Sequence, residues 1–250
     1  MFDQVCYKTD IGKVRPHNED AVKGYKNQYC SIMVVADGMG GHSAGEVASD
    51  MVINHIEKHF DEELKFEDPE ELRKWLKQIL NQINQQILTY IADHRLSHGM
   101  GTTAIIAVVT KSFIALAHIG DSRAYLLSHQ RLRQITKDHT FVRKLVDEGK
   151  LSEQEAKHHP HRNIIMNALG VNKDVKFDYL VLEHYDLDAI LLCTDGLTSM
   201  VDDEEILGIL RQNKSTEEKV NLMIEMANLK GGKDNISIAL CERLEGSESL

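Results

Sequence analysis

Four aspartates, each inside its own short motif, are the residues of this sequence best suited to metal chemistry. The motifs are Ala36-Asp37-Gly38-Met39-Gly40-Gly41-His42, Gly120-Asp121-Ser122-Arg123, Cys193-Thr194-Asp195-Gly196 and Gly232-Lys233-Asp234-Asn235. Three of these aspartates directly follow runs that predict a buried strand or a strand hairpin. Carboxylates delivered from strand ends to one place are the ligands that hard divalent cations such as Mg2+ and Mn2+ prefer. The pattern therefore predicts a divalent metal centre.

Asp37 is the natural bridging ligand for a pair of cations, because Gly38 follows it. Glycine lets the backbone come close, so its carbonyl can also serve as an oxygen ligand. Two cations about 3.5–4 Å apart acidify a bridging water, neutralise a phosphate and stabilise developing charge. Taken singly the motifs are weak, since Asp-Gly is an ordinary turn dipeptide and Asp121 could simply cap a tight hairpin. Their joint occurrence favours the metal interpretation.

A fifth motif lies upstream of the aspartates and reads Gly12-Lys13-Val14-Arg15-Pro16-His17-Asn18-Glu19-Asp20. A phosphatase must hold a dianion before it is attacked, and the guanidinium fork of arginine matches phosphate oxygens. A lone arginine in a loop is normally a solvated surface residue, and Glu19 and Asp20 alone would usually be solvated charges. The spacing of Arg15 from the acidic pair favours a phosphate-binding role.

Together, the five motifs resemble those of the metal-dependent protein Ser/Thr phosphatases of the PP2C (PPM) family, in its bacterial form. The resemblance covers nearly the whole chain, in family order. It implies Mn2+ or Mg2+ as cofactor, with two ions per active site and a third in bacterial-type members. The ligands it implies are Asp37, Asp195 and Asp234 for the first ion, Asp37 and the Gly38 carbonyl for the second, Glu19 and Asp20 for the second through water, and Asp121 with Asp195 for the weaker third.

The resemblance also implies an activity, the hydrolysis of phosphoserine and phosphothreonine in proteins by direct attack of a metal-activated bridging water. Arg15 would bind the phosphate. His42 is the candidate general acid for the leaving alkoxide. In eukaryotic members the histidine comes two residues after the aspartate, where this chain has Met39, so a water on a metal is the alternative acid. A cognate bacterial Ser/Thr kinase and its substrates are the implied partners, and residues 137–162 correspond to the flap beside the active site.

Two other functions stay open at the level of sequence. A non-catalytic pseudophosphatase would bind phosphopeptide without turnover, but such proteins usually lose metal aspartates, and all are present here. A two-metal nuclease is disfavoured by the formal net charge of −10, because phosphate contacts need basic surface. The same acidity argues against any nucleic-acid partner.

Composition favours one globular domain over residues 1–244, followed by a short tail over 245–250. The 250 residues include 42% hydrophobic and 27% charged side chains, which supports a core and argues against bulk disorder. No stretch resembles a signal peptide and no apolar run reaches about 18 residues, so we expect a cytoplasmic protein without membrane insertion. We also expect a monomer. The four cysteines form no C-x-x-C pair and lie in apolar runs, which predicts buried free thiols.

Strands and helices come in blocks, which favours sheets covered by helices over alternating βαβ units. The predicted strands are 29–36, 102–109, 113–119, 123–127, 132–135, 175–182, 189–193 and 236–241. The predicted helices are 43–60, a long one from Asp68, 141–148, 152–158, 202–211 and 216–229. The resemblance adds a four-layer αββα sandwich, with two antiparallel sheets between helix layers.

Several weaker signals are set aside. Gly40-x-x-x-x-Gly45 begins like a P-loop, but Glu46 follows where lysine is required. No cysteine has an arginine six positions later, so a cysteine-dependent phosphatase is excluded. Asp186 and Asp188 precede a strand and fit surface turn residues. His158, His159 and His161 could hold zinc, but an exposed loop is the simpler interpretation.

Overall fold

Continuous burial along most of β3 (Cys30–Met39) explains why this chain forms layers. Ile32 and Val34 point into one hydrophobic core, whereas Met33 and Val35 point into another, and all four are fully buried. Successive side chains of a strand face opposite sides of its sheet, so a strand that is apolar at both parities must be covered on both sides. The sequence of β3 therefore places its sheet in the interior of the molecule.

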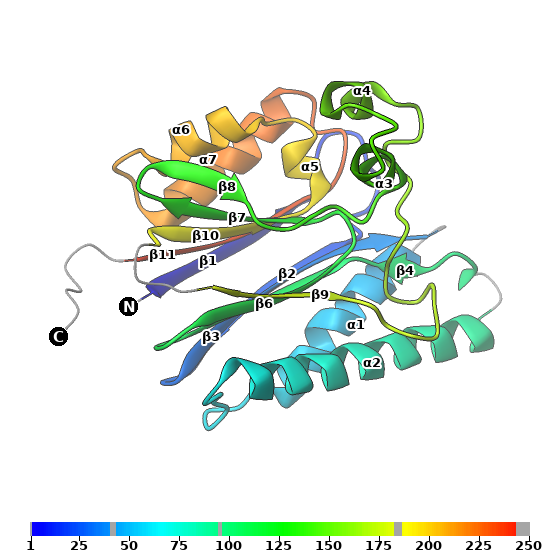
Figure 1. The fold of residues 1–250 in the computed structure, drawn as a ribbon, viewed down its shortest axis with the longest axis horizontal. Coiled ribbons are helices and arrows are strands. Elements are labelled where there is room, and N and C mark those ends of the chain that lie inside the picture. Colours follow the sequence, from blue (N-terminus) through cyan, green and yellow to red (C-terminus); the bar gives the residue numbers. More distant parts are fainter. Residues whose placement is uncertain (1, 41–43, 95–96, 183–186, 244–250) are drawn as a thin grey trace.

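The computed structural model describes residues 2–40, 44–94, 97–182 and 187–243. Two antiparallel sheets are stacked face to face (Figure 1). The first has the order β1-β11-β10-β7-β8 and the second β2-β3-β5-β6-β9, with β4 paired to β3. The remaining strands are β1 (Phe2–Asp10), β2 (Asp20–Lys26), β4 (Gly101–Thr102), β5 (Ala104–Thr110), β6 (Ile114–Ile119), β7 (Arg123–Ser128), β8 (Arg131–Gln134), β9 (Asp178–Leu182), β10 (Ala189–Cys193) and β11 (Ile236–Arg243).

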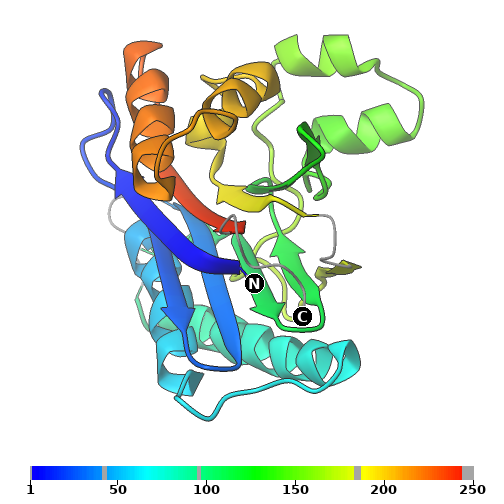
Figure 2. The same ribbon diagram turned by 90° about the vertical axis from the view of Figure 1, so that its left-hand side faces the viewer.

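Helices cover the outer face of each sheet (Figures 1 and 2). The helices are α1 (Ala44–His59), α2 (Pro69–Asp93), α3 (Phe141–Asp147), α4 (Glu153–His158), α5 (Asp195–Thr198), α6 (Asp203–Leu210) and α7 (Thr216–Leu229). α1 and α2 pack on the sheet that contains β3, and α5, α6 and α7 pack on the other. A third core fills the space between the sheets. The predicted αββα architecture is confirmed.

Local sequence signals set several helix boundaries. Asp68 caps α2, its carboxylate accepting the backbone N–H groups of Glu70 and Glu71, as the predicted helix start requires. α4 begins with a reciprocal capping box between Ser152 and Glu155. These caps satisfy N–H groups that the first helical turn leaves without partners. The helix starts could therefore be predicted from a few residues.

Three elements were not predicted: β1, β2 and the short helix α5. The predicted strand 102–109 is interrupted at Thr103, whose N–H donates to the carbonyl oxygen of Asp37. The predicted strand 175–182 begins only at Asp178. Cys30, Cys193 and Cys241 are buried free thiols, as predicted, but Cys6 is only partly buried because β1 is an edge strand.

Candidate metal centre and phosphate site

The β2–β3 hairpin places two acidic residues directly opposite each other. In its register Asp20 pairs with Asp37, next to the end of the sheet. Asp37 was predicted to follow its strand, but β3 continues to Met39 because Gly38 and Met39 pair with β4. Like charges opposite one another in a sheet are destabilising. This pair therefore needs a compensating group.

Gly38 lies where three backbone segments meet. A Cβ at this position would lie 2.1 Å from the Gly45 carbonyl oxygen and 2.5 Å from the Glu19 carbonyl oxygen, so no side chain fits. The Gly38 N–H donates to the Glu19 carbonyl at 3.0 Å. The glycine that sequence reasoning assigned to close backbone approach is thus required by packing, and it holds the Glu19 loop against Asp37.

Asp195 follows a strand of the first sheet, and the loop before β11 of the same sheet brings Asp234 beside it. Asp195 is the first residue of α5, directly after β10 and Thr194. A Cβ on Gly196 would lie 1.8 Å from the Asn235 carbonyl oxygen, so the Asp-Gly dipeptide permits contact between these loops. Because β3 and β10 belong to different sheets, stacking of the sheets brings Asp37 and Asp195 together.

Asp121 occupies the sharp turn between β6 and β7. It is 8% exposed, and its Oδ1 atom is buried without a hydrogen-bond partner among the described residues. A buried carboxylate oxygen without a protein partner is costly, and such an oxygen normally binds an ion or a water. Burial, and then the nearby charge of Asp195, raise the pKa of Asp121. The donor set therefore fits a hard divalent cation, which would offset both effects.

The aspartates Asp20, Asp37, Asp121, Asp195 and Asp234, here called the aspartate centre, repel one another. Burial raises the pKa of Asp20 and Asp121 to about 7, and neighbouring carboxylates contribute to both shifts. Burial and the charge of Asp234 raise the pKa of Asp195 to about 6. Burial first, and then the charges of the other four, raise the pKa of Asp37 well above its ordinary value. Bound cations would relieve this repulsion.

Arg15 lies at the edge of the aspartate centre. Its Nη2 atom donates to Asp234 Oδ2 at 2.6 Å, and its side chain is about half exposed, at 48%. The hydrogen bond to Asp234 raises the pKa of Arg15, and the charges of Glu19 and Asp37 add to the shift. Burial raises the pKa of Glu19, whose side chain is partly buried. A permanent cation therefore faces solvent beside the carboxylates, as phosphate binding requires.

Sequence reasoning missed the polar residues that hold these loops. Asn235 accepts the Glu19 N–H at 2.8 Å and donates to the carbonyls of Ile11 and His17 at 2.9 Å each. The buried Thr194 donates its hydroxyl to Asp20 Oδ2 at 2.8 Å. Both residues are direct neighbours of predicted aspartates in the quoted motifs, which is the signal that could have found them.

Thr103 performs the same task on the other side of Asp37. Its hydroxyl accepts the Asp37 N–H at 2.9 Å and contacts the Ser122 hydroxyl at 2.8 Å. Thr102 donates its hydroxyl to the Asp37 carbonyl at 3.0 Å. The backbone of Asp37 is thereby connected to the turn that carries Asp121.

The carboxylate oxygens of the aspartate centre are not drawn tightly together. Within the described residues, one group of at least three His, Cys, Asp or Glu side chains has all its ligand atoms within 4.8 Å, and it consists of His118, His139 and Asp178. That group was not predicted. The predicted general acid His42 lies outside the described residues, as do Asp186 and the tail over 245–250. Asp188, His158 and His161 are exposed, in agreement with their interpretation as surface residues.

Comparison with known proteins identifies the family. A family model described as Protein phosphatase 2C matches residues 13–232. The chain belongs to the protein phosphatase 2C family. It is 41% identical to the serine/threonine phosphatase stp of Listeria welshimeri over 95% of this chain and 94% of that protein. It is 34% identical to the protein phosphatase PhpP of Streptococcus pneumoniae, over 95% and 96%.

Solved structures of phosphatases share the fold. The serine/threonine phosphatase Stp1 of Staphylococcus aureus has a TM-score of 0.90 at 36% identity, covering 96% of this chain and 95% of that one. The catalytic domain of PstP, in complex with two manganese ions, has a TM-score of 0.83 at 37% identity, covering 96% and 97%. This member of the protein phosphatase 2C family is a divalent-metal-dependent serine/threonine protein phosphatase that acts on phosphoproteins. Among the described residues, no helix has the length and apolar character needed to cross a bilayer.

Proposed function

We propose that this phosphatase hydrolyses its phosphoserine and phosphothreonine substrates by direct attack of water, without a covalent phosphoenzyme. The observation that carries the proposal is the aspartate centre, built from strand ends of both sheets, with the Arg15 guanidinium beside it. Mn2+ or Mg2+, two ions with a third at a weaker site, would acidify the attacking water and neutralise the phosphate when bound.

The ligands fall into three sets. Asp37, Asp195 and Asp234 would hold the first ion, and Asp37 with the Gly38 carbonyl would hold the second. Asp121 and Asp195 would hold the third, which the partnerless Oδ1 atom of Asp121 supports. Glu19 and Asp20 would act on the second ion through water, and the hydroxyl of Thr194 donates a hydrogen bond to the Asp20 carboxylate.

Arg15 would bind the non-transferring oxygens of the substrate phosphate. Its guanidinium has five N–H donors, and the hydrogen bond to Asp234 uses one of them. The arginine thus can hold a phosphate while still contacting the carboxylate. His42 is the proposed proton donor to the leaving alkoxide, and a water is the alternative donor.

We also propose a cellular context. Residues 1–244 would act as one domain and as a monomer in the cytoplasm, opposing a Ser/Thr kinase. Residues 137–162 would form a flap that contacts protein substrates. In support, α3 and α4 project beside the end of the sheets (Figure 1), and no residue of α4 is buried.

Acid-quench labelling tests the direct mechanism. The enzyme with Mn2+ is mixed with excess phosphopeptide carrying 32P, quenched in acid during turnover, and separated on a denaturing gel. We expect released phosphate and no label on the protein. Label that accumulates on the protein with the rate of turnover would overturn direct attack by water.

Variants of Arg15 test the phosphate site. Arg15→Ala is expected to lower kcat/KM for a phosphothreonine peptide by about 10- to 100-fold, since a charge-assisted contact to phosphate is lost. Arg15→Lys should recover part of the loss, because it restores the charge without the fork. Asp188→Asn, on an exposed residue, is the control. Normal kinetics in Arg15→Ala would contradict the assignment.

A further inference from the structure

Two strands and a loop bring two histidines and an aspartate together outside the aspartate centre. In the β6–β9 pairing, His118 lies opposite Asp178. His139 lies just after β8, where the N–H of its backbone donates to the Gly120 carbonyl at 2.8 Å. The rings of His118 and His139 have their centroids 4.6 Å apart. The ligand atoms of the three side chains, here called the histidine cluster, all lie within 4.8 Å of one another.

His118 has no explanation in the packing of the core. Its side chain is completely buried, and neither Nδ1 nor Nε2 has a hydrogen-bond partner of good geometry among the described residues. The charges of Asp178 and Asp138 and the backbone of Ser122 favour the charged ring, but burial outweighs them. Burial lowers the pKa of His118 to about 4, so at neutral pH the ring is uncharged and has a free lone pair. A buried polar ring without partners costs stability unless something else binds it.

We propose that His118, His139 and Asp178 form a site for one Zn2+ ion, or a similar divalent cation that prefers nitrogen ligands, separate from the aspartate centre. Two imidazoles and one carboxylate are a ligand set typical of zinc sites with an open fourth position. The Nε2 atom of His139 and Oδ2 of Asp178 are already 3.1 Å apart. When two atoms bind one zinc ion at about 2.0–2.2 Å in tetrahedral geometry, the distance between these two atoms is only slightly longer than that separation.

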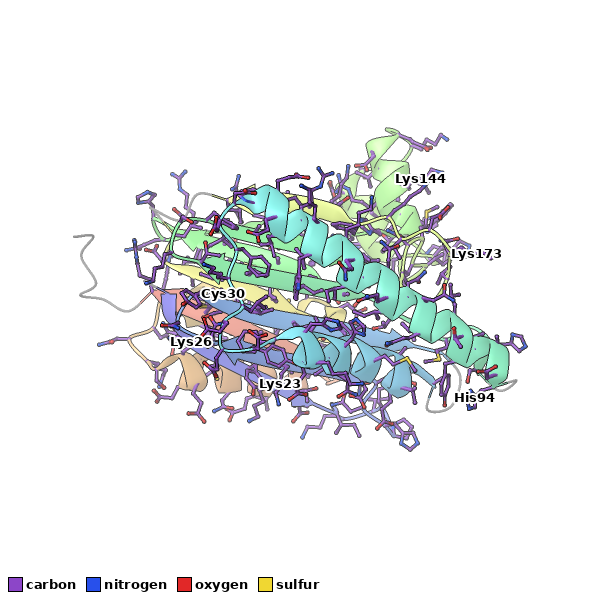
Figure 3. The ribbon with its side chains drawn as sticks, turned by 90° about the horizontal axis from the view of Figure 1, so that it is seen from below. Lys23, Lys26, Cys30, His94, Lys144 and Lys173 are labelled. Atoms are coloured by element: carbon purple, nitrogen blue, oxygen red, sulfur yellow. The ribbon has the colours of Figure 1, made fainter. Side chains whose placement is uncertain are left out.

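An ion can reach this site from solvent. The side chain of Asp178 is 52% exposed. His139 lines a cavity of about 580 Å³ between the flap and the segment before β9. Lys144 and Lys173 line the same cavity from these two segments, and Figure 3 shows both at one end of the molecule. Asp138, Asp147 and Asp174 also line it, so the lysines do not make it uniformly positive.

Metal binding would change the contacts of His139. Its Nδ1 atom now accepts the Gly120 N–H at 3.1 Å, so the ring proton is on Nε2 and faces Asp178. When Nε2 binds a cation, that proton must leave, and Nδ1 takes one up, so the ring stays neutral. A protonated Nδ1 cannot accept from Gly120, and the bond breaks. Because Asp121 follows Gly120, occupancy of the histidine cluster is coupled to the turn that carries Asp121.

Cobalt absorption spectroscopy tests the site without measuring turnover. The intact enzyme is held in excess Mn2+, which is expected to occupy the aspartate centre, and one equivalent of Co2+ is added. Tetrahedral Co2+ with nitrogen ligands absorbs strongly in the visible range, whereas octahedral Co2+ with oxygen ligands absorbs weakly. We expect intense bands in the wild type, and loss of the bands when one equivalent of Zn2+ follows.

Variants assign the bands to their ligands. His118→Leu should abolish them, and it is expected to fold because the replaced nitrogens have no partners among the described residues. Asp178→Asn, which changes the exposed member of the cluster, should weaken Co2+ binding at least about tenfold. Loss of a residue that only hydrogen-bonds to a metal ligand already lowers metal affinity by about this factor, and loss of a ligand itself should lower it more. Asp174→Asn, an exposed aspartate of the same cavity, is the matched control and should bind normally. The proposal would be overturned if the wild type showed only weak bands, or if His118→Leu kept intense bands. Either result would favour a buried water at His118.

Hydrogen exchange tests the coupling to Asp121. Addition of one equivalent of Zn2+ to the Mn2+-loaded enzyme should accelerate exchange of the Gly120 amide in the wild type, but not in His118→Leu. Unchanged exchange in a wild type that shows the cobalt bands would contradict the breaking of the Gly120–His139 bond. Neither the cobalt absorption nor the exchange rate of the Gly120 amide depends on phosphatase activity. The metal site and the proposed catalytic mechanism can therefore be disproved independently of each other.

Discussion

The aspartate centre and the histidine cluster are both largely buried groups of titratable side chains, but their chemistry differs. The aspartate centre gathers like charges, and burial together with repulsion from neighbouring carboxylates raises the pKa of Asp20, Asp37, Asp121 and Asp195. The histidine cluster contains a neutral ring whose pKa burial lowers to about 4. Burial disfavours the charged form in both cases. The two regions therefore suit different cations, hard ions at the oxygen-only centre and borderline ions at the histidines.

The difference also predicts opposite responses to pH. A carboxylate with a raised pKa destabilises the metal-free fold as pH rises, because the native state binds more protons than the unfolded state. A histidine with a lowered pKa destabilises the fold as pH falls, because the unfolded state binds more protons. Measurements in a chelator can therefore separate the two regions.

The largest effect is expected for Asp37→Asn. Loss of the carboxylate that we propose bridges two ions should lower kcat for a phosphopeptide by at least about 1,000-fold, or ~4 kcal/mol, at saturating Mn2+. The same change should raise the melting temperature in EDTA, because it removes the charge that the other aspartates repel. Activity assays and thermal unfolding check both outcomes. A variant that lost activity and stability together in EDTA would instead indicate a damaged fold.

Asp121→Asn measures the pH response of the aspartate centre. The pKa of Asp121 is about 7 in the folded protein, against about 3.9 when unfolded, so its charge costs the metal-free fold about 4 kcal/mol above pH 7. In EDTA the variant should gain stability relative to the wild type as pH rises from 4 to 8. Urea unfolding at several pH values gives this difference. A difference that stays constant with pH would contradict the raised pKa of Asp121.

His118→Leu measures the opposite response. The pKa of His118 is about 4 in the folded protein, against about 6.5 when unfolded. The free energy of unfolding should therefore fall by about 3 kcal/mol between pH 6.5 and 4 because of this residue. The wild type should therefore lose stability relative to His118→Leu as pH falls through this window. The same urea series checks it. If the free energies of unfolding of the wild type and of His118→Leu changed in parallel as pH falls, the lowered pKa of His118 would be contradicted.

The smallest effect is expected for Thr194→Val. The substitution keeps the shape but removes the hydroxyl that donates to Asp20 Oδ2 and accepts the Ser237 N–H. We expect kcat/KM to fall by about 10-fold and the Mn2+ concentration for half-maximal activity to rise, because a partner of a carboxylate in the centre is lost. Thr194→Ser should restore both values. Equal losses in the two variants would point to packing of the methyl group.

The sequence alone determined the features that depend on local patterns. The caps at Asp68 and Ser152 set helix starts within a few residues, and the continuous apolar run that ends at Asp37 predicted a buried strand. The acidic motifs were recognisable because each aspartate lies beside a glycine or a small polar residue. These neighbours allow close approach of the backbone or hold the loop that carries the aspartate. The assignment of those motifs to particular ions stays a prediction.

Only the tertiary structure decided what depends on register and on the stacking of the sheets. No local pattern places Asp20 opposite Asp37, and β2 was not predicted because its sequence is only partly apolar. In the sequence, His118 is one polar residue in a buried strand, and its neighbours His139 and Asp178 come from a loop and from another strand. The pairing of β6 with β9 and the path of the chain after β8 bring them together. Contacts between segments distant in sequence arise from the packing of whole layers, which local propensity does not specify.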